Sequence, residues 1–283
     1  MNKIVNADCI PFLRGLSNDF VDVSFADPPF NLGKKYTSYN DTRNEQDYFA
    51  WCEQWLTQLV RVTRGAVFIH GTFSLLCQYF KVLEKLASFK HWIAWNAPTG
   101  IAGTKGLQPT HYGILYFEKS PTFNKIRYPH LRDKGGRMVK NYGGKASLIH
   151  PFGPVVSDVW TDIHRVQHNR DAHPCQLPPA LLERLILMAS NEGDVIFDPF
   201  MGTGTTAVAA KKLNRRYLGC EIDAAYANIA KANVEAAKQT TIANIPVSLH
   251  RGNLRTIRDA DWPILSQFHY IPENIKTEAV ALF

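Results

Sequence analysis

Several features are scarce or absent in this chain of 283 residues. No run reaches the roughly 18 apolar residues of a membrane-spanning helix. The first residues carry no apolar signal segment, so we expect a cytoplasmic protein without a membrane partner. Cysteine is sparse: the five residues are odd in number and scattered, which favours reduced thiols. Internal repeats and low-complexity tracts are also absent, which argues against repeat and disordered architectures.

Acidic residues are in the minority. The chain has 32 Lys and Arg against 25 Asp and Glu, a net charge of +7. This excess fits a polyanionic partner without identifying one. With 45% apolar residues, a chain of this length can bury a full core, and we expect one α/β domain with an inserted or appended module.

The most informative short motif is Asp27-Pro28-Pro29-Phe30. It follows residues 21–25, an apolar run typical of a buried strand, and two consecutive prolines cannot extend a strand. The chain must therefore leave the sheet at Asp27, which places a carboxylate and an aromatic ring at the carboxyl edge. Open α/β sheets bind ligands at this edge. The motif alone would equally fit an ordinary turn.

Strand and helix patterns alternate through most of the chain, which predicts a mostly parallel α/β sheet. The predicted strands are 3–7, 21–25, 65–70, 92–95, 112–117, 194–197 and 216–220. The predicted helices begin near residues 10, 47, 72, 177, 206 and 224. Because strands 92–95 and 112–117 follow each other without a helix, we expect an antiparallel edge.

Regular periodicity disappears between residues 118 and 172, where basic residues are interleaved with aromatic ones. Basic side chains match phosphates and aromatic rings match bases, so we favour a nucleic-acid contact over a solvated surface loop. The predicted DNA-binding residues are Lys34 and Lys35 in an earlier polar loop, and Lys125, Arg127, Arg132, Lys134, Arg137, Lys140 and Lys145. Beyond residue 240 the pattern is too weak to assign.

A second strong signal is a strand, a Gly-x-Gly turn, a helix and a further strand ending in a carboxylate. Gly202 and Gly204 allow a ligand to approach the backbone, and Glu221 is spaced to accept hydrogen bonds from ribose hydroxyls. The third glycine of the dinucleotide fingerprint and the Gly-Lys-Ser/Thr of a phosphate loop are both missing. Asp198 would repel a pyrophosphate but suits a cofactor with a cationic amino group, such as S-adenosylmethionine.

Together, Asp27-Pro28-Pro29-Phe30 and the later segment from Asp198 to Thr206 resemble the motifs of the DNA amino-methyltransferases, in the order of their permuted β group. The resemblance covers most of residues 3–236. It implies a Rossmann-like methyltransferase fold with circularly permuted motif order, S-adenosylmethionine as cofactor and double-stranded DNA as partner. A homodimer and a cognate restriction endonuclease are also consistent with it.

The resemblance also implies roles for particular residues. Asp27 and the carbonyl of Pro28 would accept hydrogen bonds from an exocyclic amine, Pro29 would keep this arrangement rigid, and Phe30 would stack on a flipped base. The implied cofactor site consists of Asp8, Cys9, Asp27, His173, Pro174, Asp198, Pro199, Phe200, Met201, Gly202, Thr203, Gly204, Thr205, Thr206, Glu221 and Ile222. Leu177 stands where many members have lysine.

We therefore divide the chain into a catalytic half (1–118), a target-recognition region (119–172), a cofactor-binding half (173–240) and a C-terminal extension of unknown role (241–283). Asp at the first motif position is commoner among adenine enzymes, so we predict methylation of adenine. The alternatives are cytosine amino-methylation and a non-catalytic nucleic-acid-binding regulator on the same scaffold.

Two other chemistries are disfavoured. Pro174-Cys175 resembles the nucleophilic Pro-Cys of cytosine ring-carbon methyltransferases, but those enzymes lack Asp-Pro-Pro-Phe. His164, His168, His173 and Cys175 have spacings that suit zinc. Without a second cysteine pair we predict no metal site.

Overall fold

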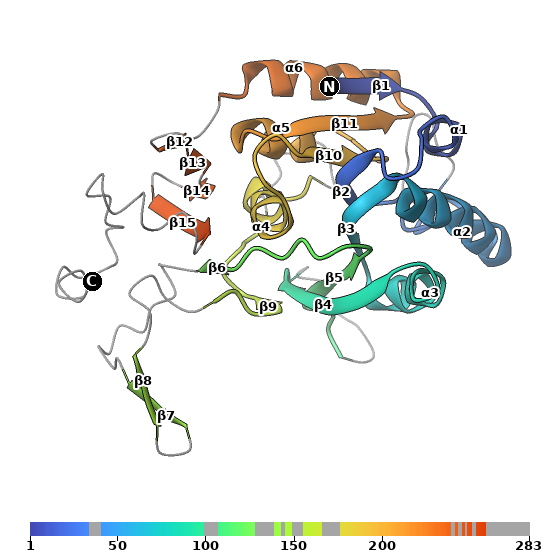
Figure 1. Ribbon diagram of the computed structural model, residues 1–283. Coiled ribbons are helices and arrows are strands. Elements are labelled where there is room, and N and C mark those ends of the chain that lie inside the picture. The colour runs from blue at the N-terminus through green and yellow to red at the C-terminus, as the bar shows by residue number, and fades with distance from the viewer. Residues whose placement is uncertain are drawn as a thin grey trace.

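The structure, a computed structural model, describes residues 1–33, 41–98, 107–127, 139–142, 145–148, 155–165, 176–238, 241–242, 245–246, 248–250 and 253–258. Its centre is an eight-stranded twisted sheet with the order β1-β11-β10-β2-β3-β5-β4-β9 (Figure 1). The strands are β1 (Asn2–Asn6), β2 (Val21–Ala26), β3 (Thr63–Gly71), β4 (Ser88–Asn96), β5 (His111–Glu118), β9 (Val159–Trp160), β10 (Val195–Asp198) and β11 (Arg216–Glu221).

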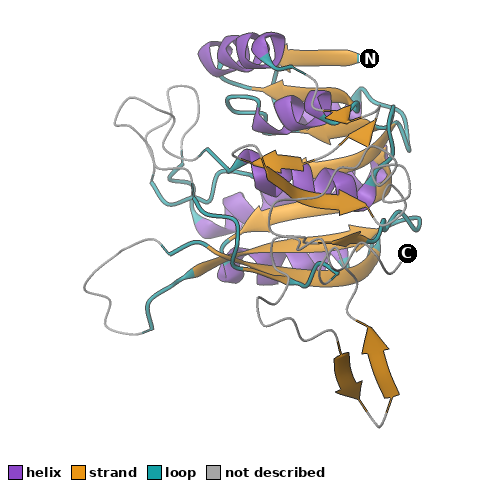
Figure 2. Cartoon of the chain, turned by 90° about the vertical axis from the view of Figure 1, so that its left-hand side faces the viewer, coloured by secondary structure: helices purple, strands orange, loops and turns teal. Residues whose placement is uncertain are grey.

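Helices cover both faces of this sheet (Figure 2). They are α1 (Cys9–Arg14), α2 (Glu45–Val62), α3 (Phe73–Leu83), α4 (Pro179–Ala189), α5 (Thr205–Lys212) and α6 (Ala224–Ala236). Each strand and helix predicted from the sequence is present, with its ends moved by up to four residues. The predicted antiparallel element is also confirmed: β5 runs against its neighbours β3 and β4.

The two faces of the sheet bury separate cores. On β3, Val67 and Ile69 face the core formed with α1, α2 and α3, whereas Ala66 and Phe68 face the core formed with α4 and α5. Successive side chains of a strand point to opposite faces, so a strand covered on both sides must be apolar throughout. This explains why the central strands are continuous apolar runs in the sequence.

The strand order supports the permuted arrangement. β1, at the start of the chain, pairs in parallel with β11, and α6 packs against β1. The chain leaves β10 toward β11 but leaves β2 toward β3, so the direction of winding reverses between β10 and β2. Ligands of open α/β sheets bind at such a switch point. Asp198 is the last residue of β10, and Asp27 directly follows β2.

The segment without sequence periodicity contains short strands. They are β6 (Ile126–Arg127), β7 (Val139–Tyr142), β8 (Lys145–Leu148) and β9. Strands of two to four residues are too short to produce a periodic pattern, which is why the sequence did not predict them. The β7–β8 hairpin stands away from the sheet in both views (Figures 1 and 2).

The C-terminal extension also contains strands that the sequence left unassigned: β12 (Thr241–Ile242), β13 (Ile245–Pro246), β14 (Ser248–His250) and β15 (Asn253–Arg258). β15 pairs with β14 and with β6, so the extension and the start of the predicted recognition region share a small sheet. In the described ranges, no helix has the length and apolar character needed to cross a membrane.

Candidate active site

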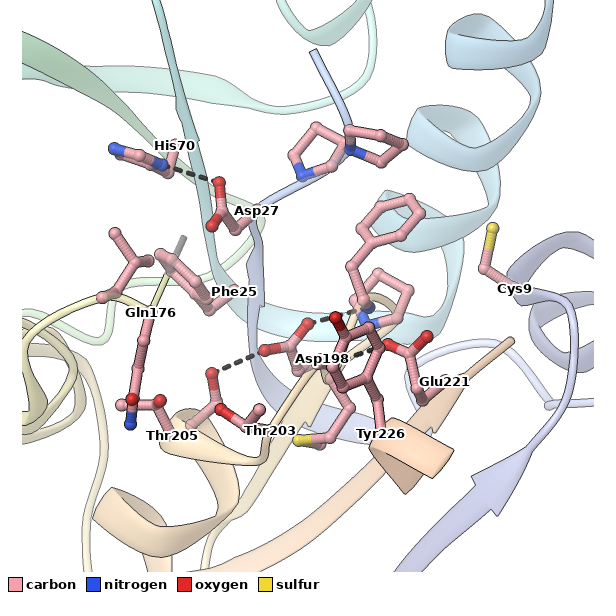
Figure 3. Close-up of a pocket in the computed structure, with 18 of the residues that line it drawn as sticks. Cys9, Phe25, Asp27, His70, Gln176, Asp198, Thr203, Thr205, Glu221 and Tyr226 are labelled. Atoms are coloured by element: carbon pink, nitrogen blue, oxygen red, sulfur yellow. Dashed lines mark hydrogen bonds and ion pairs between the residues drawn. The ribbon is translucent and has the colours of Figure 1, made fainter. Parts of the chain in front are cut away.

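A cavity of about 350 Å³ opens at the carboxyl ends of the central strands, on both sides of the switch point. We call it the edge pocket. Asp27 directly after β2, Asp198 in β10 and Glu221 in β11 surround the same space (Figure 3). The two motifs, separated by about 170 residues in the sequence, therefore contribute to one site. Its volume lies within the usual range for small-molecule sites, about 300–1,000 Å³.

Asp198 lies beneath the turn that follows β10 and is 3% exposed. The backbone N–H of Phe200 donates to its Oδ1 (2.9 Å), and the Thr206 hydroxyl donates to its Oδ2 (2.5 Å). Burial raises the pKa of Asp198 to about 7, because the charged form loses hydration. Both carboxylate oxygens thus accept hydrogen bonds from the turn and stabilise it. The contribution of Asp198 to ligand binding in the pocket is therefore mainly its negative charge.

Glu221 at the end of β11 is also tied to the backbone. Gly202 N–H donates to its Oε2 (2.8 Å), and Asp223 N–H donates to its Oε1 (2.9 Å). Burial raises the pKa of Glu221. The turn and the strand end are therefore joined directly, and Glu221 keeps its place on the pocket wall.

Gly204 does not line the edge pocket. It has φ of +89° at the N-cap of α5, and a Cβ there would lie 2.9 Å from the Cβ of Ala230 on α6. Glycine is required here because α5 and α6 pack closely and the backbone is left-handed. From the sequence we had expected it to let a ligand approach the backbone. The other described members of the predicted cofactor set all line the pocket: Asp8, Cys9, Asp27, Asp198, Pro199, Phe200, Met201, Gly202, Thr203, Thr205, Thr206, Glu221 and Ile222.

Asp8 and Cys9 begin α1 on the far wall of the pocket. The Asp8 carboxylate caps the helix by accepting from Ile10 N–H (2.8 Å). Burial raises the pKa of the Cys9 thiol to about 12, so the sulfur is a neutral wall atom and not a thiolate nucleophile.

The Asp27-Pro28-Pro29-Phe30 segment lines the other half of the pocket and is braced from outside. The Tyr48 hydroxyl donates to the Pro29 carbonyl (2.7 Å). Buried Asp41 accepts from the backbone N–H groups of the next two residues, Asn31 (2.9 Å) and Leu32 (3.0 Å). These contacts pre-organise the motif.

An aromatic wall adjoins Asp27. It consists of Phe30, His70, Trp95 and Tyr112, whose rings lie 5.2–6.4 Å apart in the pairs that touch. Flat aromatic surfaces suit a planar ring as ligand. The His70 Nδ1 lies 2.7 Å from Asp27 Oδ1 (Figure 3).

Two arginines line the rim among the described residues. The Arg43 guanidinium lies 5.0 Å from the Trp51 ring, and that of Arg165 lies 5.9 Å from the Tyr112 ring. Sequence reasoning missed them, together with Ala7, Phe25, Trp51, His70, Trp95, Tyr112, Gln176, Leu177, Leu182 and Tyr226. His70 carried one usable signal, its position as the last residue of the predicted strand 65–70.

Several predicted residues lie outside the described part of the chain: Lys34, Lys35, Arg132, Lys134, Arg137, His173 and Pro174. Lys125 is exposed, Arg127 is in β6, and Lys140 and Lys145 lie on the β7–β8 hairpin. Across the described residues, no three His, Cys, Asp or Glu side chains are arranged to hold a metal ion. His164 is exposed, and the other three residues of the zinc hypothesis are not described.

Comparison with known proteins gives consistent results. Residues 21–232 match the family described as DNA methylase. The chain is 34% identical to the type II methyltransferase M.BamHI of Bacillus amyloliquefaciens over 78% of this chain and 55% of that protein, and so spans about half of its length. It is 36% identical to M.HpaI of Haemophilus parainfluenzae over 83% of this chain and 74% of that protein. It is 28% identical to the DNA adenine methyltransferase YhdJ of Escherichia coli over 83% of both chains.

Solved structures share the fold. The complex of M1.HpyAVI with S-adenosylmethionine has a TM-score of 0.55 at 20% identity, covering 83% of this chain and 99% of that one. The cytosine-N4-specific PvuII DNA methyltransferase has a TM-score of 0.60 at 14% identity, covering 86% and 88%. The family match spans both motifs and every residue of the edge pocket except Ala7, Asp8 and Cys9. This chain therefore belongs to the DNA methylase family.

Proposed function

We propose that this protein transfers a methyl group from S-adenosylmethionine to the exocyclic amine of adenine in double-stranded DNA. The main support is the position of Asp27. Its carboxylate lines the edge pocket. The Gly202 turn and Glu221 line the same pocket on the other side of the switch point. A methyl donor and its acceptor must meet in one such space.

The cofactor half suits an adenosine carrying an amino-acid tail. When bound, S-adenosylmethionine supplies an electrophilic methyl group. Asp8, Asp198 and Glu221 make this half of the pocket strongly acidic, which favours a cationic ligand and disfavours a pyrophosphate. Phe200, Ile222 and Tyr226 supply apolar surface beside these carboxylates. Glu221 is the residue proposed to accept from ribose hydroxyls.

The other half suits a purine base that has left the duplex. Asp27 would accept a hydrogen bond from the exocyclic amine, and this contact would help the nitrogen lone pair leave the plane of the ring. Phe30 and Tyr112 offer flat surfaces on which the base can stack. The contacts from Tyr48 to Pro29 and from Asp41 to the following residues keep the motif in place while the base enters.

Basic residues near the pocket support DNA as the substrate. Arg43 and Arg165 stand at its rim, and residues 119–172 contain the lysines and arginines predicted to contact DNA. We assign this region to target recognition because phosphate contacts set position and neighbouring side chains can read bases. Arg184 and Asp162 hold one end of it on α4 through two hydrogen bonds, of 3.0 and 2.7 Å.

The choice of adenine rests on Asp27 and on the similarity to YhdJ, which is named as an adenine enzyme. The PvuII enzyme, named as cytosine-specific, has the same fold, so fold does not select the base. We further propose that the protein acts in the cytoplasm, forms a homodimer and has a cognate restriction endonuclease. Support for the endonuclease is the designation of relatives as type II methyltransferases.

Incubation with labelled S-adenosylmethionine and unmodified double-stranded DNA tests the proposal. The DNA is then digested to nucleosides, which are separated by mass spectrometry, with Asp27→Ala as the control. We expect N6-methyladenine with the wild-type protein only. Methylcytosine without methyladenine would refute the base assignment, and cofactor binding without methylation of any DNA would favour the regulator.

A further inference from the structure

His70 is the immediate partner of Asp27, and the sheet register explains why. β2 and β3 are parallel neighbours, with Ala26 opposite Ile69, so the next residues along the two strands are Asp27 and His70. Neighbouring strands lie about 4.8 Å apart. The His70 Nδ1 reaches Asp27 Oδ1 at 2.7 Å, a short hydrogen bond between side chains 43 residues apart in sequence.

The two side chains differ in exposure. The Asp27 side chain is 23% exposed and faces the edge pocket, whereas that of His70 is 4% exposed and lies beside it in the aromatic wall. The His70 ring is held between Phe30, Trp95 and Tyr112 at centroid distances of 5.8, 5.9 and 5.2 Å. These contacts prevent the imidazole from turning, so its Nδ1 has a constant direction.

The tautomer of His70 follows from these contacts. An ionised carboxylate only accepts hydrogen bonds, so Nδ1 must carry the proton. The Nε2 atom is buried, and no group among the described residues forms a hydrogen bond with it. A second proton there would create a buried, unpaired N–H on a charged ring, which is more costly than a bare acceptor nitrogen. His70 is therefore a neutral imidazole that donates through Nδ1.

This hydrogen bond occupies one oxygen of Asp27. The other, Oδ2, has no hydrogen-bond partner among the described residues. A carboxylate free to rotate would present either oxygen in many directions, but the contact with His70 fixes the carboxylate and leaves Oδ2 as the oxygen with no bond to the protein in the described residues. The direction of Oδ2 is then determined by the sheet register and the aromatic wall.

We propose that His70 is a positioning residue that holds the Asp27 carboxylate so that Oδ2 accepts the hydrogen bond from the target amine. This assignment rests on the proposed function of the pocket. His70 itself takes no proton during the reaction, because Nδ1 is already protonated and Nε2 is enclosed. Its contribution is the orientation of Asp27, which matters only once the base is bound.

Three variants separate the hydrogen bond from simple packing. His70→Asn keeps an N–H donor at the same number of bonds from the backbone as Nδ1. His70→Leu has nearly the shape of Asn without a donor, and His70→Gln carries its donor one bond further out. Each is compared with the wild type in single-turnover methyl transfer at saturating cofactor and DNA, which isolates chemistry from product release.

We expect His70→Leu to slow the single-turnover rate by about 10- to 100-fold, the range for losing a hydrogen bond to a charged group. His70→Asn should recover most of this rate. Cofactor affinity should stay within about twofold in all three variants, because His70 lies on the base side of the pocket. Equal rates for His70→Asn and His70→Leu would show that the donor is unimportant and would overturn the proposal.

If His70→Leu does not fold, the comparison of His70→Asn with His70→Gln replaces it. The proposal then requires the Asn variant to be faster by about tenfold or more, since only its donor is at the Nδ1 position. Similar rates for these two would refute it.

NMR of the imidazole nitrogens provides a readout that does not depend on catalysis. In wild-type protein we expect the His70 ring as the neutral Nδ1–H tautomer, assigned by the loss of its signals in His70→Asn. Asp27→Ala should change the Nδ1 chemical shift, because Nδ1–H loses its acceptor. An Nε2–H tautomer in the wild type would overturn the proposal even if methylation is confirmed. A wild-type protein with the expected tautomer but no methylation would refute the proposed function instead.

Discussion

Replacing Gly204 by alanine is a direct test of how the turn after β10 is built. Gly204 has φ of +89°, and a Cβ at this position would lie 2.9 Å from the Cβ, 3.0 Å from the Cα and 3.2 Å from the carbonyl oxygen of Ala230. Two of these three atoms belong to the backbone of α6. The added methyl group can therefore be accommodated only if α5 and α6 move apart.

Two terms contribute to the expected cost. The left-handed backbone conformation costs a non-glycine residue about 1–2 kcal/mol. Forcing a methyl group into a filled contact costs about 1–3 kcal/mol more. We therefore expect Gly204→Ala to lower the free energy of unfolding by about 2–5 kcal/mol, a fall in Tm of roughly 3–8 °C for a chain of this size.

Gly202 is the matched control, because it has φ of +52° in the same turn and its added Cβ would meet nothing within 4 Å. Gly202→Ala should cost only the conformational term of about 1–2 kcal/mol. Thermal and urea unfolding of both variants measure the difference. Equal destabilisation would refute the packing argument, as would a loss of cofactor affinity in Gly204→Ala without loss of stability.

Other predictions concern the edge pocket and DNA binding. Asp27→Ala should abolish methyl transfer while cofactor affinity, measured by calorimetry, stays within about threefold of the wild type; wild-type turnover would disprove the role of Asp27. Asp198 has a pKa raised to about 7, and a cationic ligand needs its ionised form. Cofactor affinity should therefore fall as the pH drops below 7, by up to about tenfold per pH unit, and Asp198→Asn should remove this dependence; a flat wild-type profile from pH 6 to 8 would contradict the assignment. Glu221→Ala should weaken cofactor binding without changing DNA affinity, as titrations with each ligand would show. Changing Lys134 and Lys145 together to alanine should lower DNA affinity, measured by fluorescence anisotropy, and reduce the slope of log affinity against log salt concentration by about 2. Unaltered binding across a salt series would favour the interpretation of this segment as an ordinary surface loop.

The fold was largely predictable because its signals are local. Buried strands such as β3 are continuous apolar runs, and α2 places apolar residues at helical spacing. The short strands β6 and β15 were not predictable, because two distant segments form them only by pairing with each other.

The candidate site was predictable in part. Asp27 and the turn from Asp198 to Thr206 were found because proline and glycine mark strand ends in the sequence itself. Gly204 was found for a different reason from the one the structure supports, since its neighbour Ala230 lies on the next helix. Arg43 and Arg165 were missed because nothing in their local sequence indicates that both reach one rim.

The sequence by itself therefore determined the α/β class and the positions of the two strand-end motifs. Backbone constraints of proline and glycine and the charge of a carboxylate act within a few residues, so they can be read without the fold. The tertiary structure decided which groups meet: that β10 and β2 are neighbours, and that His70 turns its Nδ1 to Asp27. These relations depend on strand register and on the order of strands in the sheet. Both arise from contacts between segments far apart in the chain, which no local pattern records.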